Sequence, residues 1–137
     1  MNIIFTWQVQ KAVSGCLAPL VVSIEDDIRS VIPSLLLVLY ESDSYAHRRG
    51  AAYGLAGVFQ GLGILALKDY DIMVTVLGGL QDKKNLQRRE GSLLAVSMLS
   101  MGLGRGFEPF VLKTIPFVLQ SIGENIRGNT DQKIYQN

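Results

Sequence analysis

The segment RRGAAYGLAGVFQGLG at residues 48–63 decides the fold, because a second copy of its pattern follows about forty residues later. That copy, RREGSLLAVSMLSMGLG at residues 88–104, starts with the same two arginines and ends with the same Gly-Leu-Gly. The arginine pairs are forty positions apart, whereas the shared glycines are forty-one positions apart. A period of this size indicates a chain built from successive copies of one small unit.

Apolar residues recur every three or four positions along most of the chain, which is the spacing of one face of an α-helix. Val13, Leu17 and Leu20 belong to one such stripe. A second marker agrees, because VIPSLLLVL at 31–39 resembles TIPFVLQSI at 114–122, about two periods later. Since HEAT and armadillo units have periods of roughly 40 to 47 residues, we predict an all-α HEAT-repeat α-solenoid. It should contain about three pairs of antiparallel helices, six helices in all and no strand.

Four glycines lie on one face of the helix predicted over residues 45–63. Glycine inside a helix costs up to about 1 kcal/mol relative to alanine, so the spacing requires a reason. We predict that a neighbouring backbone lies close to this face. The corresponding face one period later carries an alanine and a methionine in place of two glycines, so we expect a wider contact there. The glycines are Gly50, Gly54, Gly57 and Gly61.

Residues 51–67 form an uncharged run, and its glycine spacing also occurs in membrane helices that associate. The run has only 17 residues, at the lower limit for a bilayer span, and it contains Gln60. We therefore predict no membrane segment. The amino-terminal residues 1–13 lack a basic leader and a cleavage site of small residues, which favours a cytoplasmic location.

Composition argues against catalysis. The chain has 13 Lys and Arg against 12 Asp and Glu, so no overall charge attracts nucleic acid or a membrane. Cys16 is the only cysteine and His47 the only histidine, and neither has a partner in the sequence that completes a catalytic or zinc site. We predict a protein that is not an enzyme and binds no cofactor or metal.

Polar residues mark the turns between the predicted helices. Asp43 and Ser44 precede a helix predicted to begin near Tyr45, Asp69 precedes one near Tyr70, and Asn85 precedes one near Leu86. Their side chains can accept hydrogen bonds from the first backbone N–H groups of a helix, so we expect them to be N-caps.

Basic residues gather near two of these turns, and stacked units would bring them to one edge of the solenoid. Such an edge could contact the phosphates of ribosomal RNA, because each neutralised phosphate releases counterions. The candidate contact residues are Arg49, Lys83, Lys84 and Arg89.

A structural role for the neighbouring arginines is the alternative. Arg48 could pair with Asp43, and Arg88 with Asp82, so that each ion pair ties together the two helices of one unit. We assign these four residues to structural pairs within the repeats.

The segments at residues 45–73 and 80–99 resemble the general control non-derepressible family of translational activators. The AAYGLAG motif, followed by QDKKN and RREG, carries the resemblance, which extends from about Gln10 to about Gly123. This region of the family is similar to the HEAT domain of fungal elongation factor three.

The resemblance implies a cytosolic, ribosome-associated scaffold that helps a starvation-sensing protein kinase to phosphorylate translation initiation factor two. It implies the ribosome, that kinase and an ABC-type ATPase as partners. A HEAT-repeat scaffold of another class, such as part of a nuclear-transport receptor or a phosphatase scaffold, is the alternative.

Both ends of the chain depart from the family pattern. We predict a HEAT-repeat segment over residues 1–124, partial at both ends, and a polar, disordered tail over residues 125–137. The second helix of the last unit is not recognisable, so apolar residues of the helix before it should lack their usual neighbour. Self-association through exposed terminal helices is therefore expected.

Overall fold

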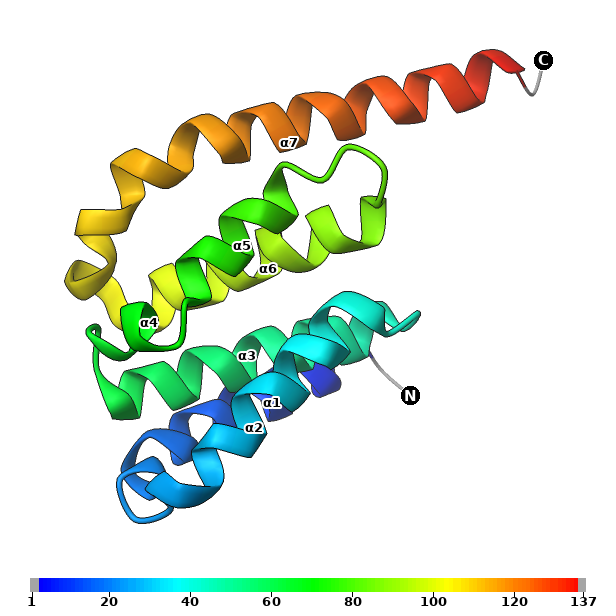
Figure 1. Cartoon of the computed structure of the whole chain (residues 1–137). Helices are drawn as coiled ribbons and strands as arrows, with labels where there is room; N and C mark the ends of the chain where they lie inside the picture. Colours follow the sequence, from blue (N-terminus) through cyan, green and yellow to red (C-terminus); the bar gives the residue numbers. More distant parts are fainter. Residues whose placement is uncertain (1–2, 136–137) are drawn as a thin grey trace.

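The computed structural model describes the backbone of residues 3–135, and the side chains of residues 7–124 and 127 except residue 25 (Figure 1). Within residues 3–135 every regular element is a helix, and the predicted all-α fold is confirmed. The elements are α1 (Ile3–Val21), α2 (Glu25–Glu41), α3 (Tyr45–Leu62), α4 (Ala66–Asp69), α5 (Ile72–Leu80), α6 (Leu86–Leu103), a 3-10 turn (Gly104–Phe107) and α7 (Glu108–Tyr135).

The helices form two layers. Helix α3 lies between α1 and α6, so these three make one layer, whereas α2 packs on α3 and α5 packs on α6 (Figure 1). Helix α7 contacts α5 and α6 and continues the second layer. Helices α1, α3 and α6 end at Val21, Leu62 and Leu103, which are forty-one residues apart in each step. The repeat unit of the sequence is therefore one helix from each layer.

The apolar core lies between the layers. Leu55 and Phe59 of α3 are fully buried, as are Ile72 of α5 and Leu99 of α6. The Phe59 ring meets Tyr70 edge to face, with 6.1 Å between the ring centroids. Each fully buried side chain of this size contributes about 1.5–3 kcal/mol, so the core stabilises each unit against its neighbours.

The glycine face of α3 lies against α1, as the sequence predicts. A Cβ atom added to Gly57 would lie 2.5 Å from the Ser14 carbonyl oxygen, and one added to Gly61 would lie 2.5 Å from that of Ala18. Between α3 and α6 the contact is wider, because a Cβ added to Gly102 would lie 3.3 Å from the Cβ of Ala56. Close approach of the α1 backbone thus explains Gly57 and Gly61, whereas a Cβ added to Gly50 or Gly54 would meet the side chain of Gln10 or Leu35.

The helix that the sequence predicts to begin near Tyr70 begins two residues later in the structure. The residues after α3 form a separate four-residue helix, α4, and α5 begins only at Ile72. Asp71 lies between them with φ of 51°, a left-handed conformation that interrupts a helix and that aspartate tolerates better than most residues. Asp69 ends α4 and caps no helix, so that cap prediction is wrong.

The end of the chain also differs from its prediction. Helix α7 runs continuously to Tyr135, through residues that we predicted to be a disordered polar tail. No proline follows Pro116 to stop the helix, and polar composition alone does not end one. The division of the chain at residue 124 stays a prediction.

The uncharged run at residues 51–67 is shared between α3, the following loop and α4. In the part of the chain that is described, no helix is both long enough and apolar enough to span a bilayer. The run is used for packing against α1 and for the core.

Candidate contact surface at the interhelical turns

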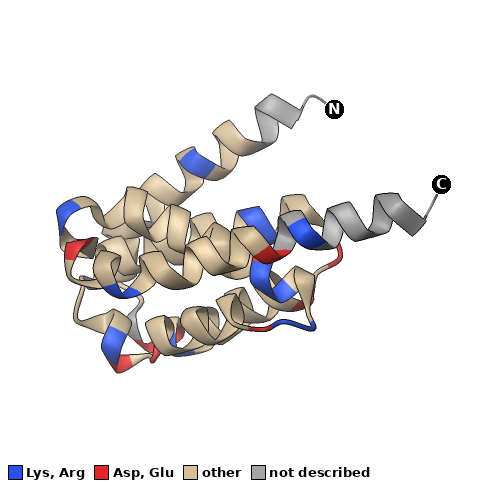
Figure 2. Ribbon diagram, turned by 90° about the horizontal axis from the view of Figure 1, so that it is seen from above, with Lys and Arg blue, Asp and Glu red and all other residues tan. Residues whose placement is uncertain are grey.

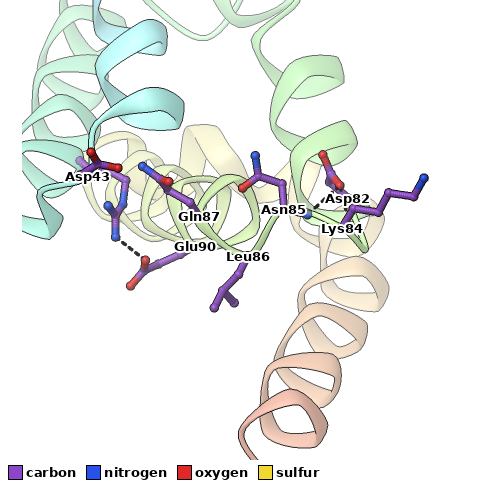
Figure 3. A pocket seen from close by; sticks show the side chains of 8 residues that line it. Asp43, Asp82, Lys84, Asn85, Leu86, Gln87 and Glu90 are labelled. Carbon is purple, nitrogen blue, oxygen red and sulfur yellow. Dashed lines mark hydrogen bonds and ion pairs between the residues drawn. The ribbon is translucent and has the colours of Figure 1, made fainter. Parts of the chain in front are cut away.

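Two turns lie side by side at one end of the layers: residues 42–44 between α2 and α3, and residues 81–85 between α5 and α6. We call them together the turn edge. They border a shallow depression of about 700 Å³ (Figure 3). Its lining residues are Asp43, Arg48, Asp82, Lys84, Asn85, Leu86, Gln87 and Glu90.

Polar side chains fix both turns. The Ser44 hydroxyl accepts a hydrogen bond from the backbone N–H of His47 at 3.4 Å, and the Asn85 side chain accepts one from Arg88 at 3.0 Å. Ser44 and Asn85 are thus the N-caps of α3 and α6, as predicted, whereas Asp43 is not the cap of α3. One carboxylate oxygen of Asp82 also accepts the N–H groups of Lys84 and Asn85, each at 3.1 Å. The lysine-bearing turn therefore has a defined backbone.

Each unit carries one buried arginine that holds its turn. Arg48 is 6% exposed and donates to the Ser42 carbonyl at 2.8 Å. Arg89 is 7% exposed and donates to the carbonyls of Asp82 and Lys83 at 2.8 and 2.9 Å. These two arginines are forty-one positions apart, the same spacing as the helix ends. They are thus the equivalent pair, and the forty-position alignment of Arg48 with Arg88 is off by one residue.

The ion pairs differ from those predicted. Among the described residues, Arg48 pairs with Glu90 of α6 at 2.5 Å, not with Asp43 of its own turn (Figure 3). Gln87 of α6 donates to the same Ser42 carbonyl that Arg48 holds. Arg48 therefore links one unit to the next, because the chain brings Glu90 over the turn of the preceding unit.

Arg88 remains near its predicted partner. Its guanidinium lies 3.9 Å from the Asp82 carboxylate, and both side chains are partly exposed. The same guanidinium lies 5.4 Å from the ring centroid of Tyr40. Arg88 is consequently the surface arginine of the two. The sequence analysis predicted the reverse, with Arg89 at the contact surface and Arg88 in a structural ion pair.

The four predicted contact residues fall into two groups. Arg49 is half-buried, and its Nε donates to the side chain of Gln10 in α1 at 2.9 Å, while Arg89 is buried against its turn. Lys83 and Lys84 are exposed, and within the described residues neither ammonium group has an ion-pair partner. Only the two lysines present free positive charge at the turn edge.

A buried polar pair behind the turn edge was not foreseen. The Ser92 hydroxyl of α6 donates to the Tyr40 oxygen of α2 at 3.2 Å. Burial raises the pKa of Tyr40, and the Ser92 hydrogen bond and the Arg88 charge act in the opposite direction. Tyr40 therefore stays protonated near neutral pH and joins the two units. Periodicity gives no signal for such a pair.

The described part of the chain holds no group of three His, Cys, Asp or Glu side chains that could bind a metal ion. His47 is exposed, with its Nδ1 3.5 Å from the Ser42 hydroxyl. What the turn edge offers is exposed ammonium groups on a rigid backbone.

A model of the EF3 N-terminal HEAT repeat matches residues 48–132, which is more than half of the chain. The chain belongs to this family. The match includes Arg48 and Arg89 and the turn at residues 81–85, whereas the turn at residues 42–44 lies just before it. It also confirms the HEAT-repeat architecture that the period predicts.

This EF3-type HEAT segment is similar to parts of much longer proteins. It is 50% identical to "Stalled ribosome sensor GCN1" of Homo sapiens over 117 residues, 85% of this chain. It is 47% identical to "Protein ILITYHIA" of Arabidopsis thaliana and 35% identical to "eIF-2-alpha kinase activator GCN1" of Saccharomyces cerevisiae, each over 86% of this chain. The chain spans about 4% of the length of each. No solved structure matches it significantly.

The resemblance drawn from residues 45–73 and 80–99 is thereby confirmed. The segment corresponds to part of a GCN1-type protein, in the region that resembles the elongation factor three HEAT domain.

Proposed function

We propose that this chain acts as a non-enzymatic scaffold segment of a ribosome-associated translational activator, one that promotes phosphorylation of translation initiation factor two by a kinase during amino-acid starvation. Its similarity to proteins named for stalled-ribosome sensing and for activation of the eIF-2-alpha kinase supports this function. A kinase and an ABC-type ATPase are the proposed partners, and the cytoplasm is the proposed location. A nuclear-transport or phosphatase scaffold has no comparable support.

The turn edge is the proposed ribosome contact, and Lys83 and Lys84 are its contact residues. Their backbone is held by the Asp82 carboxylate and by the buried guanidinium of Arg89. Since the turn is already ordered, binding loses little conformational entropy beyond that of the two side chains. Arg49 and Arg89 position the surface in this proposal and do not contact the ribosome.

Replacing Lys83 and Lys84 with alanine is expected to weaken binding of the purified chain to ribosomes. Each lysine that neutralises a phosphate contributes about 0.7–0.9 to the slope of log K against log salt, so the double variant should lower that slope by roughly 1.5. Co-sedimentation with ribosomes across a salt series measures both the affinity and the slope.

The matched control is Lys68→Ala with Lys113→Ala, which removes the same charge from exposed positions on α4 and α7. It should leave the slope close to that of the unmodified chain. If both double variants lower the slope equally, binding reflects net charge and the turn edge is not the contact. If the unmodified, helical chain does not co-sediment at any salt concentration, the ribosome contact itself is wrong.

A further inference from the structure

Helix α1 carries an exposed apolar stripe on the side away from α3. Val9, Val13 and Leu20 are 53–55% exposed, and Cys16 between them is exposed as well. The opposite side of α1 packs on α3 through Ser14, whose hydroxyl donates to the Tyr53 carbonyl at 2.6 Å. The stripe is therefore a second, uncovered face of a helix whose other face is already used.

The repeat period shows what kind of face this is. The stripe residues lie forty-one positions before Gly50, Gly54, Gly57 and Gly61. In α3 those glycines face the helices that precede it, mainly α1. The stripe on α1 thus occupies the same positions, one period earlier, as the glycine face of α3. It is the face that a helix of this layer uses to contact a preceding helix.

An apolar groove lies at the other end of the stack, between α6 and α7. Its volume is about 270 Å³, and its walls include Val96, Phe107 and Val118. Forty-one positions before Val96 and Phe107 stand Leu55 and Ala66, both buried in the core. The part of the groove formed by Val96 and Phe107 therefore repeats, one unit later, a surface that is covered within this chain.

The groove continues onto an uncharged face of α7. Between Lys113 and Glu124 this helix has no charged residue (Figure 2). Leu119, on the groove wall, is 65% exposed. An exposed face of this kind is typical of a contact with another protein surface, and it carries no charge that would oppose an apolar helix.

We propose that the α6–α7 groove of one copy receives helix α1 of a second copy, so that copies associate head to tail. Helix α1 belongs to the α1–α3–α6 layer, whereas α7 belongs to the other layer. An α7 from one copy and an α1 from the next would thus form a complete two-helix unit, continuing the interface that already joins α3 to α6. The inference does not depend on the proposed function.

Such a contact joins two different surfaces and leaves one of each free, so it does not close into a dimer. Sedimentation velocity of the 137-residue chain should show a mean mass that rises with concentration past that of a dimer. The chain is expected to be monomeric at low micromolar concentration, since a single apolar groove of this size offsets the cost of association only weakly.

Two variants with one damaged surface each test the geometry. Val13→Lys damages the stripe on α1, and Leu119→Lys damages the groove, and each alone should raise the dissociation constant at least about tenfold. An equimolar mixture should form a one-to-one dimer, because the intact groove of the first variant can receive the intact α1 of the second. Lysine at both positions prevents a new ion pair between the damaged surfaces.

Val74→Lys is the matched control, since Val74 is an exposed residue of α5 outside both surfaces. It should assemble like the unmodified chain, and circular dichroism should show equal helix content in all variants. If Leu119→Lys loses helix, Ile115→Lys replaces it, because Ile115 is another exposed residue of α7 that lines the groove. A chain that stays monomeric at all concentrations would overturn the proposal, as would a mixture of the two variants that stays monomeric. Assembly unaffected by Val13→Lys would also overturn it and indicate pairing through α7 alone.

Discussion

A chain with alanine at both Gly57 and Gly61 is expected to lose roughly 2–4 kcal/mol of unfolding free energy, since overpacking costs about 1–3 kcal/mol per site. Each new Cβ would lie 2.5 Å from a carbonyl oxygen of α1, and no side-chain rotation can move a backbone oxygen away. Helix α1 must therefore shift away from α3. The gain in helix propensity, up to about 1 kcal/mol per site, offsets only part of this loss.

Urea denaturation followed by circular dichroism measures the effect. The control is Gly15→Ala with Gly78→Ala, because an added Cβ at either position has no neighbour within 4 Å. This pair lies in α1 and α5 and should stabilise the chain, by up to about 1 kcal/mol per site. If the Gly57 and Gly61 pair proves as stable as this control, then α1 does not lie against α3 as described.

The sequence predicts this part of the structure well for a physical reason. Glycines that recur on one helix face against their propensity, as Gly57 and Gly61 do, indicate a close neighbouring backbone, whereas the helical glycines Gly15 and Gly78 face open space. The helix ends follow the same logic, because Gly63 and Gly104 have positive φ and stop α3 and α6 one period apart. Features that backbone geometry imposes can be read from single residues.

The turn edge is less predictable, because adjacent arginines look alike in a sequence. The pairs at 48–49 and 88–89 align by eye at forty positions, and this alignment makes Arg88 the equivalent of Arg48. Burial follows the forty-one-residue period of the helix ends instead and selects Arg89. Which residue of a charged pair turns inward depends on the helix phase to within one position, about 100° of rotation.

The polar contacts between units also cannot be predicted from the sequence. The pairing of Arg48 with Glu90, and of Ser92 with Tyr40, joins residues more than forty positions apart in the chain. A period indicates that units stack, but the offset between stacked helices sets which polar side chains meet. That offset is fixed by packing around the glycines, so these pairs appear only in the folded chain.

Arg89→Ala is expected to cost about 2–3 kcal/mol, because hydrogen bonds to charged groups contribute about 1.5–3 kcal/mol and two part-buried carbonyls would lose their donor. The guanidinium holds two turn carbonyls from a site that is 7% exposed. Arg88→Ala should cost about 1 kcal/mol or less, since exposed ion pairs contribute about 0.2–1 kcal/mol. Its partner Asp82 lies at 3.9 Å and both side chains are partly exposed.

Thermal or urea unfolding of the two single variants shows whether Arg88 or Arg89 is the arginine that stabilises the turn. The comparison is direct because the two substitutions are chemically identical and adjacent. Arg48→Ala supplies the replicate in the preceding unit and should behave like Arg89→Ala, since Arg48 is equally buried and also loses Glu90. Equal losses for Arg88→Ala and Arg89→Ala would contradict the forty-one-residue register of the arginines. A larger loss for Arg88→Ala would restore the forty-residue alignment and return Arg89 to the exposed surface, where it would join Lys83 and Lys84 as a candidate contact.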